Sequence, residues 1–399
     1  MLKTLAVNNY RSLFDLVVPL TKLNVITGEN GCGKSNLYKS LRLLAETAKG
    51  GVVNALAKEG GLAATFWAGP SKSSNNHNGE PIQGTASTKT TRLRLGFASE
   101  QFSYSILLGY PEAAMYTTCL RPDEKAVASK FNLDPEIKRE TIWFGDYYRP
   151  ATSLVDRLGS IVKVKYNNYW EVIERHTPVF ESIFTQAVYI DKTPEVILLR
   201  EKIKGWRFYD HFRSDFDAPA RQLQLGTRTT VLSHDGCDLA SALQTIIEIG
   251  DDNSLHEALN DAFPKSRIEI DKLDDGRLVI EFYQHGLLRS LSAKELSDGT
   301  LRYLLWVAAL LSPRPPELMV LNEPETSLHP SLLPALSRLI IKASKITQIL
   351  VVSHANTLID ALENDDECNI IRLEKEYGKT KVIGQGLLSK PSWHWTDIK

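Results

Sequence analysis

Short apolar runs separated by polar residues open the chain and predict three strands. These are expected over residues 2–7, 16–20 and 23–27. The third run is compact and β-branched, which is typical of a strand. Behind it, Leu37, Leu41 and Leu44 recur at helical spacing, so we expect a helix to begin near residue 34. Alternation over residues 92–110 predicts a β-hairpin with one apolar face.

The last third of the chain alternates helical periodicity with short apolar runs. Helices are expected over residues 239–249, 301–311 and 332–343, and strands over residues 268–270, 278–283, 318–321 and 349–352. The last two strands are apolar at every position, and a helix lies between them. This order predicts a parallel sheet covered on both faces.

Residues 111–220 are the least regular part of the chain. They mix charged, helix-like pieces with an aromatic and arginine-rich segment over residues 206–221. That segment could stack on nucleic-acid bases, or it could pack as an ordinary amphipathic element. No heptad repeat is sustained there, which argues against a long coiled coil.

Composition excludes several classes of protein. The 399 residues carry 47 Lys+Arg and 48 Asp+Glu, a net charge of −1, so any binding of DNA must use a local basic surface. Four cysteines without a C-x-x-C pair argue against a disulfide framework or zinc fingers and favour a cytoplasmic protein. Neither a signal peptide nor a membrane-spanning run is expected, so no membrane partner is predicted.

Residues 28–35, Gly-Glu-Asn-Gly-Cys-Gly-Lys-Ser, match the phosphate-binding pattern G-x-x-x-x-G-K-[ST] between a predicted strand and a predicted helix. Backbone N–H groups of such a loop surround phosphates, and the helix N-terminus adds positive potential. Lys34 would reach the β- and γ-phosphates of ATP, and the Ser35 hydroxyl would bind Mg²⁺. The thiol of Cys32 is expected to be exposed there and open to oxidation. The residues expected to bind nucleotide are Asn30, Gly31, Cys32, Gly33, Lys34, Ser35 and Asn36.

A second segment, Glu-Leu-Ser-Asp-Gly-Thr-Leu-Arg over residues 295–302, places Ser297 and Gly299 at the start of a predicted helix. Hydroxyl and backbone N–H groups at such a position can hold an anion. The alternative is an ordinary helix N-cap.

Two apolar strands end in candidate catalytic residues. The strand over residues 318–321 ends in Asn322 and Glu323, and a carboxylate at a strand end can orient or deprotonate a water. The strand over residues 349–352 leads to His354, which could contact a γ-phosphate or simply be solvated.

The order of these segments resembles the ABC-type ATPase head of the RecF/SMC/Rad50-like and OLD-like AAA family. The resemblance covers about residues 1–50 and 230–375. It implies Walker A at residues 28–35, with Arg11 beside the nucleotide, and a signature at Ser297 and Gly299. It implies Walker B with Asn322 on Mg²⁺ and Glu323 as the catalytic glutamate. A D-loop would follow at residues 325–330, and His354 would be the switch histidine.

The resemblance implies an α/β P-loop NTPase fold of ABC-ATPase head type, with a mixed sheet core, an antiparallel β subdomain and an α-helical insertion. Residues 1–110 would form an N-terminal ATPase lobe, residues 111–230 a mostly helical insertion and residues 231–399 a C-terminal ATPase lobe. Two heads of this family sandwich two ATP molecules, so a homodimer is expected in which Walker A of one copy meets Ser297 of the other.

The sequence departs from the family pattern at three places. Asn322 stands where Walker B has Asp, which keeps an oxygen ligand but loses its charge, so we expect weaker Mg²⁺ organisation and slow turnover. Asp298 stands where the signature has Gly, and Thr300 where it has Gln or Glu. Candidates for the Q-loop glutamine are Gln186, Gln222 and Gln224.

Three functions fit an ATPase head of this kind. It could act on DNA in repair, chromosome maintenance or anti-phage defence. It could instead be a regulatory subunit that controls a separately encoded effector protein, such as a nuclease. A transporter subunit is disfavoured because 289 positions separate Lys34 from Glu323.

Overall fold

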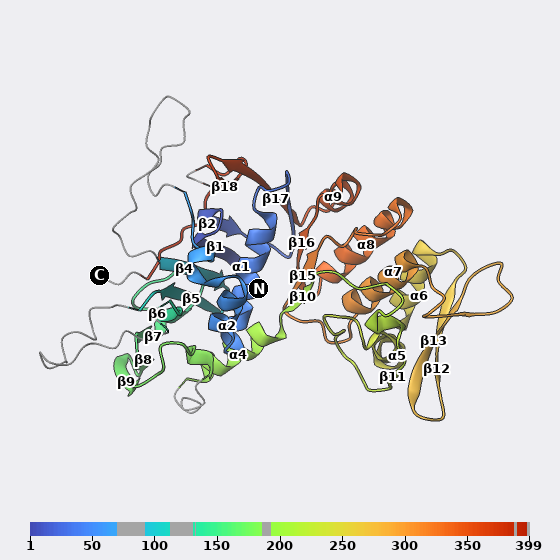
Figure 1. The fold of residues 1–399 in the computed structure, drawn as a ribbon, viewed down its shortest axis with the longest axis horizontal. Coiled ribbons are helices and arrows are strands. Elements are labelled where there is room, and N and C mark those ends of the chain that lie inside the picture. The colour runs from blue at the N-terminus through green and yellow to red at the C-terminus, as the bar shows by residue number, and fades with distance from the viewer. Residues whose placement is uncertain (70–91, 112–130, 132, 186–192, 387–388, 397–399) are drawn as a thin grey trace, which may run out of the picture. The chain divides into compact units, whose positions relative to one another are not determined.

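The computed structural model describes residues 1–69, 92–111, 131, 133–185, 193–386 and 389–396. The chain forms two compact units, which are treated separately (Figure 1). The parallel-sheet unit comprises Met1, Leu20–Glu29 and Gly205–Arg372, and the antiparallel-sheet unit comprises Leu2–Pro19, Asn30–Lys204 and Leu373–Lys399. The chain therefore passes from one unit to the other within the predicted phosphate loop.

Four parallel strands form the centre of the parallel-sheet unit. In spatial order they are β10 (Arg207–Tyr209), β15 (Leu318–Asn322), β16 (Gln348–Val352) and β3 (Leu23–Gly28). β17 (Cys368–Glu376) follows β3 in the sheet, and β18 (Lys379–Val382) pairs with the end of β17. The strands β15 and β16 are apolar because both of their faces are buried, which confirms the predicted parallel sheet.

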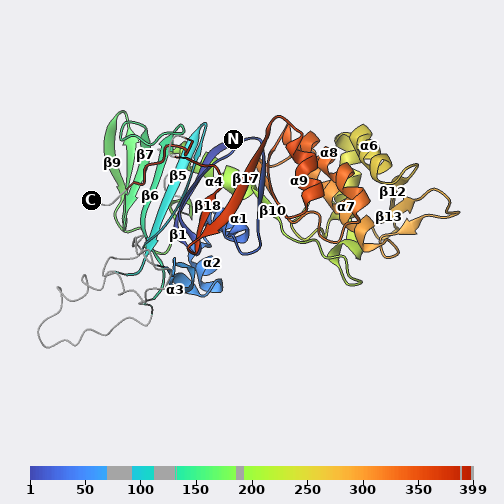
Figure 2. The same cartoon turned by 90° about the horizontal axis from the view of Figure 1, so that it is seen from above.

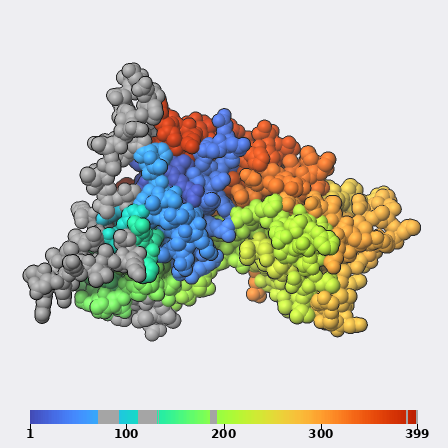
Figure 3. Space-filling model, viewed as in Figure 1, coloured from blue at the N-terminus to red at the C-terminus, as the bar shows by residue number. Residues whose placement is uncertain are grey.

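Helices of this unit bury continuous apolar faces in one core that they share with the strands. They are α5 (Leu239–Ile249), α6 (Asp252–Ala262), α7 (Asp298–Leu310), α8 (Leu333–Ser344) and α9 (Asn356–Glu363). Every residue of α7 from Leu301 to Leu310 is buried, so this helix lies inside the unit. In the space-filling view, the yellow-green part of this unit lies beside its orange part on the visible surface (Figure 3).

A small antiparallel sheet completes the parallel-sheet unit. It contains β11 (Gln224–Leu225), β12 (Arg267–Lys272), β13 (Arg277–Tyr283) and β14 (Leu291–Ser292). β12 and β13 form a hairpin that extends beyond the neighbouring helices α6 and α7 (Figure 2). The strands predicted over residues 268–270 and 278–283 are therefore confirmed.

The antiparallel-sheet unit is built on an eight-stranded sheet within the described residues. In spatial order its strands are β2 (Leu13–Pro19), β1 (Leu2–Tyr10), β4 (Arg92–Ser99), β5 (Phe102–Gly109), β6 (Glu136–Phe144), β7 (Ser153–Leu158), β8 (Ile161–Tyr166) and β9 (Tyr169–Glu174). Its helices are α1 (Lys34–Ala48), α2 (Val52–Lys58), α3 (Gly61–Thr65) and α4 (Pro194–Gly205). The predicted apolar stripe Leu37, Leu41 and Leu44 of α1 is buried, as its periodicity indicates.

Residues 111–230 differ from the prediction of a mostly helical insertion. Their described part contains the strands β6 to β9 and the short strands β10 and β11, and α4 is its α-helix. Strands near the edge of an antiparallel sheet bury one face, so charged residues alternate with apolar ones and weaken the apolar signal. In β8, Val162 and Val164 are buried between exposed neighbours. The physical origin of the error is thus the mixed polarity of these strands.

The structure contains no membrane-crossing candidate: among the described residues, no helix combines the necessary length with the necessary apolar character.

Candidate active site

The carboxyl ends of four parallel strands meet at one edge of the parallel-sheet unit. Asn322 of β15 is in register with Val352 of β16, and Val352 with Ile26 of β3. Tyr209 of β10 is in register with Leu321. In open α/β sheets, ligands bind outside these carboxyl ends. Any polar side chains that follow the strands are therefore candidates for a site.

Glu323 and His354 come together at this edge. The carboxylate oxygen Oε1 of Glu323 lies 3.8 Å from Nδ1 of His354, and both side chains are about half exposed. The backbone of Glu323 has φ +49°, in the left-handed region, and its N–H donates to the Val352 carbonyl at 2.8 Å. A non-glycine residue in this region is strained, and such strain concentrates at functional positions. The tight turn directs the carboxylate away from the strand toward solvent.

Glu325 lies behind this pair and is 8 % exposed. Its oxygen Oε1 accepts hydrogen bonds from the Ser353 hydroxyl at 2.7 Å and from the backbone N–H groups of His354 at 3.0 Å and Ala355 at 3.3 Å. Oε1 also lies 3.5 Å from the His354 imidazole. Sequence reasoning placed Glu325 only within the predicted D-loop, because a short acidic segment does not reveal which carboxylate turns inward.

Arg302 links helix α7 to the same edge. Its Nη1 donates to the carbonyl of Thr326 at 2.9 Å, and its Nη2 lies 3.0 Å from Nε2 of His211, which follows β10. An arginine can only donate, so this ring nitrogen must accept. Partial burial and the Arg302 charge lower the pKa of His211, against the opposing effect of Glu323. The structure therefore adds a neutral histidine and an arginine that the strand-and-motif pattern did not single out.

Asp210 also lies at the end of β10. Burial raises the pKa of its carboxyl to about 6, and the charge of His234 opposes the shift. A buried carboxyl group of this kind is costly to ionise. Its position right after an edge strand carried no motif signal in the sequence.

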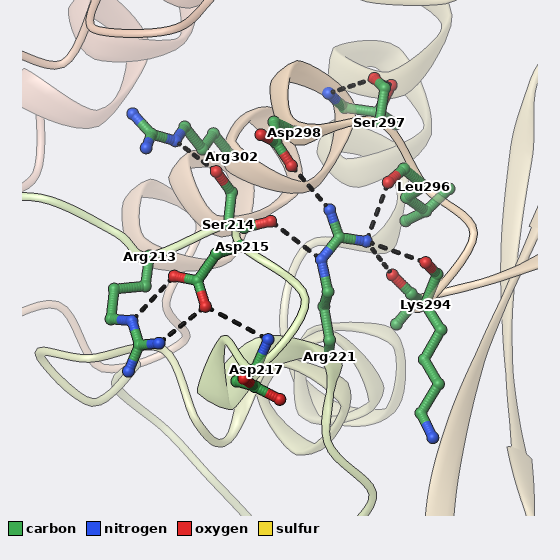
Figure 4. A network of polar contacts seen from close by, with 12 residues as sticks. Arg213, Ser214, Asp215, Asp217, Arg221, Lys294, Leu296, Ser297, Asp298 and Arg302 are labelled. Carbon is green, nitrogen blue, oxygen red and sulfur yellow. Dashed lines mark hydrogen bonds and ion pairs between the residues drawn. The ribbon is translucent and has the colours of Figure 1, made fainter.

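The predicted signature turn begins α7. Ser297 is the helix N-cap, and its Oγ accepts from the Thr300 N–H at 3.2 Å, as the N-cap interpretation expected. Its hydrogen bonds within the described residues stay inside this turn and do not reach Glu323 or His354. The neighbouring Asp298 forms an ion pair with Arg221 at 2.9 Å (Figure 4). A Cβ added at Gly299 would lie 3.6 Å from the Ser327 carbonyl, an ordinary van der Waals contact.

The second part of the phosphate loop lies in the antiparallel-sheet unit. Gly33 has φ +113°, and a Cβ there would overlap the Thr380 hydroxyl and lie 2.9 Å from the Ser12 hydroxyl. Thr380 Oγ1 donates to the Cys32 carbonyl at 2.7 Å, and Asn36 Nδ2 donates to Ser12 Oγ at 2.8 Å. Two hydroxyls distant in sequence thus brace the loop, which no local pattern could indicate.

The Cys32 thiol is 2 % exposed, so the expectation of an exposed thiol is wrong. The whole residue is enclosed, and its carbonyl accepts from the Thr380 hydroxyl at 2.7 Å. Lys34 is also largely buried, at 8 % exposed, whereas Ser35, Gly31 and Asn30 are exposed. Oxidation of Cys32 in the folded protein is therefore disfavoured by access.

Arg11 is held by a partner that the sequence did not predict. Its Nη2 lies 2.8 Å from the Glu59 carboxylate, which also accepts from the Tyr10 hydroxyl at 2.7 Å. Arg11 has φ +49°, and its buried Nε makes no hydrogen bond within the described protein. The Glu59 carboxylate therefore holds the Arg11 guanidinium in place.

The donor set for Mg²⁺ fits a site shared with phosphate. No group of three or more His, Cys, Asp or Glu side chains among the described residues could enclose a metal ion. Mg²⁺ in nucleotide sites is commonly bound by few protein oxygens together with phosphates. In the antiparallel-sheet unit, the exposed Ser35 hydroxyl at the start of α1 is an oxygen of this type. In the parallel-sheet unit, the Asn322 amide at the end of β15 offers another. Of the Q-loop candidates, Gln222 and Gln224 are exposed, and Gln186 lies outside the described residues.

Comparisons with known proteins bear on this site. Residues 1–219 match the family model described as "AAA ATPase domain", and residues 187–360 match the one described as "AAA domain, putative AbiEii toxin, Type IV TA system". No curated protein matches the chain significantly. The first of these models covers more than half of the chain.

Among solved structures, the chain is similar to an Smc head bound to the C-winged helix domain of ScpA, with TM-score 0.51 and 14% identity over 97% of this chain and 98% of that chain. It is also similar to an Smc head bound to the C-terminal domain of ScpA, derived from Pyrococcus furiosus, with TM-score 0.47 and 13% identity over 96% and 95% of the two chains. The SMC head domain from Thermotoga maritima gives TM-score 0.45 and 12% identity over 97% and 99%. At such identities the first likeness bears on the fold alone.

Proposed function

Since this chain belongs to the AAA ATPase domain family and is an ATPase with the P-loop fold of an ABC-type head, we propose that it dimerises on ATP and hydrolyses ATP at two shared sites. The observation that carries the proposal is the pairing of Glu323 with His354 at 3.8 Å on the carboxyl edge of the parallel sheet. A strained carboxylate beside an imidazole is an arrangement suited to activating water next to a phosphate.

In this proposal, each residue at the sheet edge has one task. Glu323 orients the attacking water and accepts its proton. His354 contacts the γ-phosphate oxygens from the neighbouring strand. Ser35 and Asn322 would hold Mg²⁺, which on binding neutralises charge on the β- and γ-phosphates. The amide of Asn322 supplies less electrostatic stabilisation than a carboxylate, so turnover is slow.

The phosphate loop and its neighbours bind the nucleotide. Backbone N–H groups of residues 30–36 surround the phosphates, and Lys34 contacts the β- and γ-phosphates. Arg11, whose side chain is partly exposed, contributes positive charge beside the same nucleotide. The polyphosphate thus meets a helix N-terminus and two cationic side chains, which is the electrostatic environment that it requires.

Dimerisation supplies the signature. The Ser297 hydroxyl and the Gly299 N–H lie at the start of α7, exposed or partly exposed, and would contact the γ-phosphate of an ATP bound to the second copy. Two such contacts related by a two-fold axis form an isologous dimer. ATP then links the two copies, and hydrolysis releases them.

The direct test is the Glu323→Gln variant. Without its base, the protein should bind ATP, fail to hydrolyse it and remain dimeric in light scattering after gel filtration. The parental protein should dimerise only transiently under the same conditions. Hydrolysis by the variant at the parental rate would show that Glu323 is not the base.

For the cellular role, we propose action on DNA in repair, chromosome maintenance or anti-phage defence. The order of the motifs and the likeness of the fold to an Smc head support the proposal. Because the net charge is −1, the DNA contact must use a local or dimer-created basic surface. Stimulation of ATP hydrolysis by DNA that falls steeply with salt tests this role. Co-purification with a separately encoded effector such as a nuclease, without DNA stimulation, would favour the regulatory alternative.

A further inference from the structure

The buried guanidinium of Arg221 donates hydrogen bonds to the backbone of the signature turn. Arg221 is 6 % exposed and is the last residue of a short 3₁₀ turn, Pro219–Arg221, that precedes β11. Its side chain points into the turn that leads into α7 (Figure 4). It donates to the carbonyls of Ser214 at 2.9 Å, Ala293 at 2.7 Å, Lys294 at 3.2 Å and Leu296 at 2.8 Å.

The same guanidinium forms an ion pair with Asp298. The Nη2 to Oδ1 distance is 2.9 Å, and the carboxylate is 62% exposed. Asp298 is the residue that departs from the glycine typical of the signature. The structure therefore gives this departure a partner within the same chain.

The charges around the turn would oppose phosphate without Arg221. Three carbonyl oxygens of residues 293–296 and one carboxylate face the same point, and all of them are negative. Asp298 also directly follows Ser297, where a γ-phosphate is proposed to approach. Like charges this close disfavour each other even at a partly solvated surface. A rigid, permanently charged guanidinium with several N–H donors is suited to satisfy all these acceptors together.

We propose that Arg221 is a positioning residue of the signature turn, which fixes its backbone and neutralises Asp298 so that the turn accepts the γ-phosphate of ATP bound to a second copy. This inference rests on the ATP-dependent dimer proposed above. It assigns a role to the arginine-rich segment that the sequence had left open between nucleic-acid contact and simple packing.

The test measures ATP-dependent dimerisation in the Glu323→Gln background. There the dimer should not dissociate through ATP hydrolysis. Arg221→Gln should weaken the dimer about tenfold to a hundredfold, the range expected for lost charge-assisted hydrogen bonds. Binding of a fluorescent ATP analogue to the monomer should be unchanged. Adding Asp298→Asn should restore most of the dimer affinity, because the uncompensated carboxylate is then gone.

The matched control is Arg213→Gln. Arg213 forms an exposed ion pair with Asp215 at 2.7 Å in the same region, and contacts no residue of the signature turn in the structure. The dimer affinity of the Arg213→Gln variant should equal that of the Glu323→Gln protein. If Arg221→Gln does not fold, Arg221→Lys replaces it, since an ammonium keeps the charge but cannot bridge all the acceptors. The lysine variant should show a smaller loss that Asp298→Asn relieves little, because the ammonium still offsets the carboxylate. Dimer affinity equal to that of the Glu323→Gln protein would contradict the role of the backbone hydrogen bonds.

The outcomes separate the two proposals. A background protein that stays monomeric with ATP contradicts the dimer itself. If the Glu323→Gln protein dimerises with ATP and Arg221→Gln does not weaken its dimer, the role of Arg221 is overturned. The dimer proposal then still stands. A loss in Arg221→Gln that Asp298→Asn does not relieve also overturns the role of Arg221, because Arg221 would then merely stabilise the fold.

Discussion

The backbone N–H of His354 donates a hydrogen bond to the side-chain oxygen Oε1 of Glu325 across 3.0 Å. The same oxygen accepts from the Ser353 hydroxyl at 2.7 Å. A carboxylate on the turn after β15 therefore fixes the first residues after β16. His354 in turn faces Glu323. The position of His354, a proposed catalytic residue, therefore depends on the Glu325 carboxylate.

Replacing Glu325 should lower catalysis more than substrate binding. Glu325→Ala removes a buried acceptor from three donors, a loss of about 1 to 3 kcal/mol that lets the segment after β16 relax. We expect kcat for ATP hydrolysis to fall about tenfold or more, with KM little changed. Glu325→Gln, which keeps an oxygen acceptor, should lose less. Parental kcat in Glu325→Ala would contradict this positioning role.

Lys34→Ala should abolish nucleotide binding. The change removes the one cation of the phosphate loop, and the loop's backbone dipoles alone hold a polyphosphate weakly. Binding of a fluorescent ATP analogue, followed by anisotropy, measures the loss. Lys39→Ala, on the same helix and outside the motif, is the control and should bind as the parent does. Tight binding by the Lys34 variant would count against the assigned loop.

Gly33→Ala should be far more damaging than Gly31→Ala. Both glycines have positive φ, so either alanine is strained by about 1 kcal/mol. At Gly33 the new methyl group would also overlap the Thr380 hydroxyl, whereas nothing lies within 4 Å at Gly31. Thermal unfolding should show a clear loss of stability for Gly33→Ala and a modest one for Gly31→Ala. Equal losses would mean that the hydroxyl brace yields easily.

Asn322→Asp should speed hydrolysis and reduce its Mg²⁺ requirement. The substitution introduces a charged oxygen where the amide now stands at the end of β15. Charge-assisted contacts are roughly twice as strong as neutral ones, so a gain of about tenfold in kcat at limiting Mg²⁺ is expected. A Mg²⁺ titration of the ATPase rate checks it. An unchanged titration curve would remove Asn322 from the metal site.

Asp210 should make the protein less stable as the pH rises. Its pKa is raised from 3.8 to about 6 in the folded state, so the unfolded chain loses this proton first. Stability from this group is complete below pH 3.8 and is lost between there and pH 6. Asp210→Asn should therefore gain about 1 to 3 kcal/mol relative to the parent at pH 8.

Urea unfolding of parent and variant at pH 4.5 and pH 8 measures this difference directly. The exposed Asp217 nearby provides the control, and Asp217→Asn should leave the pH dependence unchanged. If the free energy of unfolding of Asp210→Asn depends on pH as that of the parent does, ionisation of a group other than Asp210 causes the loss of stability.

The sequence by itself determined the elements that depend on local periodicity. The glycine-rich loop before α1, the apolar strands β15 and β16 and the helices α5, α7 and α8 were all predictable, because period and turn chemistry are written in consecutive residues. The order of the motifs also indicated the family. The sequence pattern could not reveal the strands β6 to β9. These strands bury only one face, so polar and apolar residues mix along them.

Only the tertiary structure decided which distant side chains meet. Thr380 braces the loop at Cys32 from 348 positions away, and Arg221 reaches Asp298 across 77 positions. These contacts carry no periodic signal, because they depend on how strands and turns are brought together rather than on neighbouring residues. The Cys32 thiol was misjudged for the same reason, since burial is a property of the packed fold.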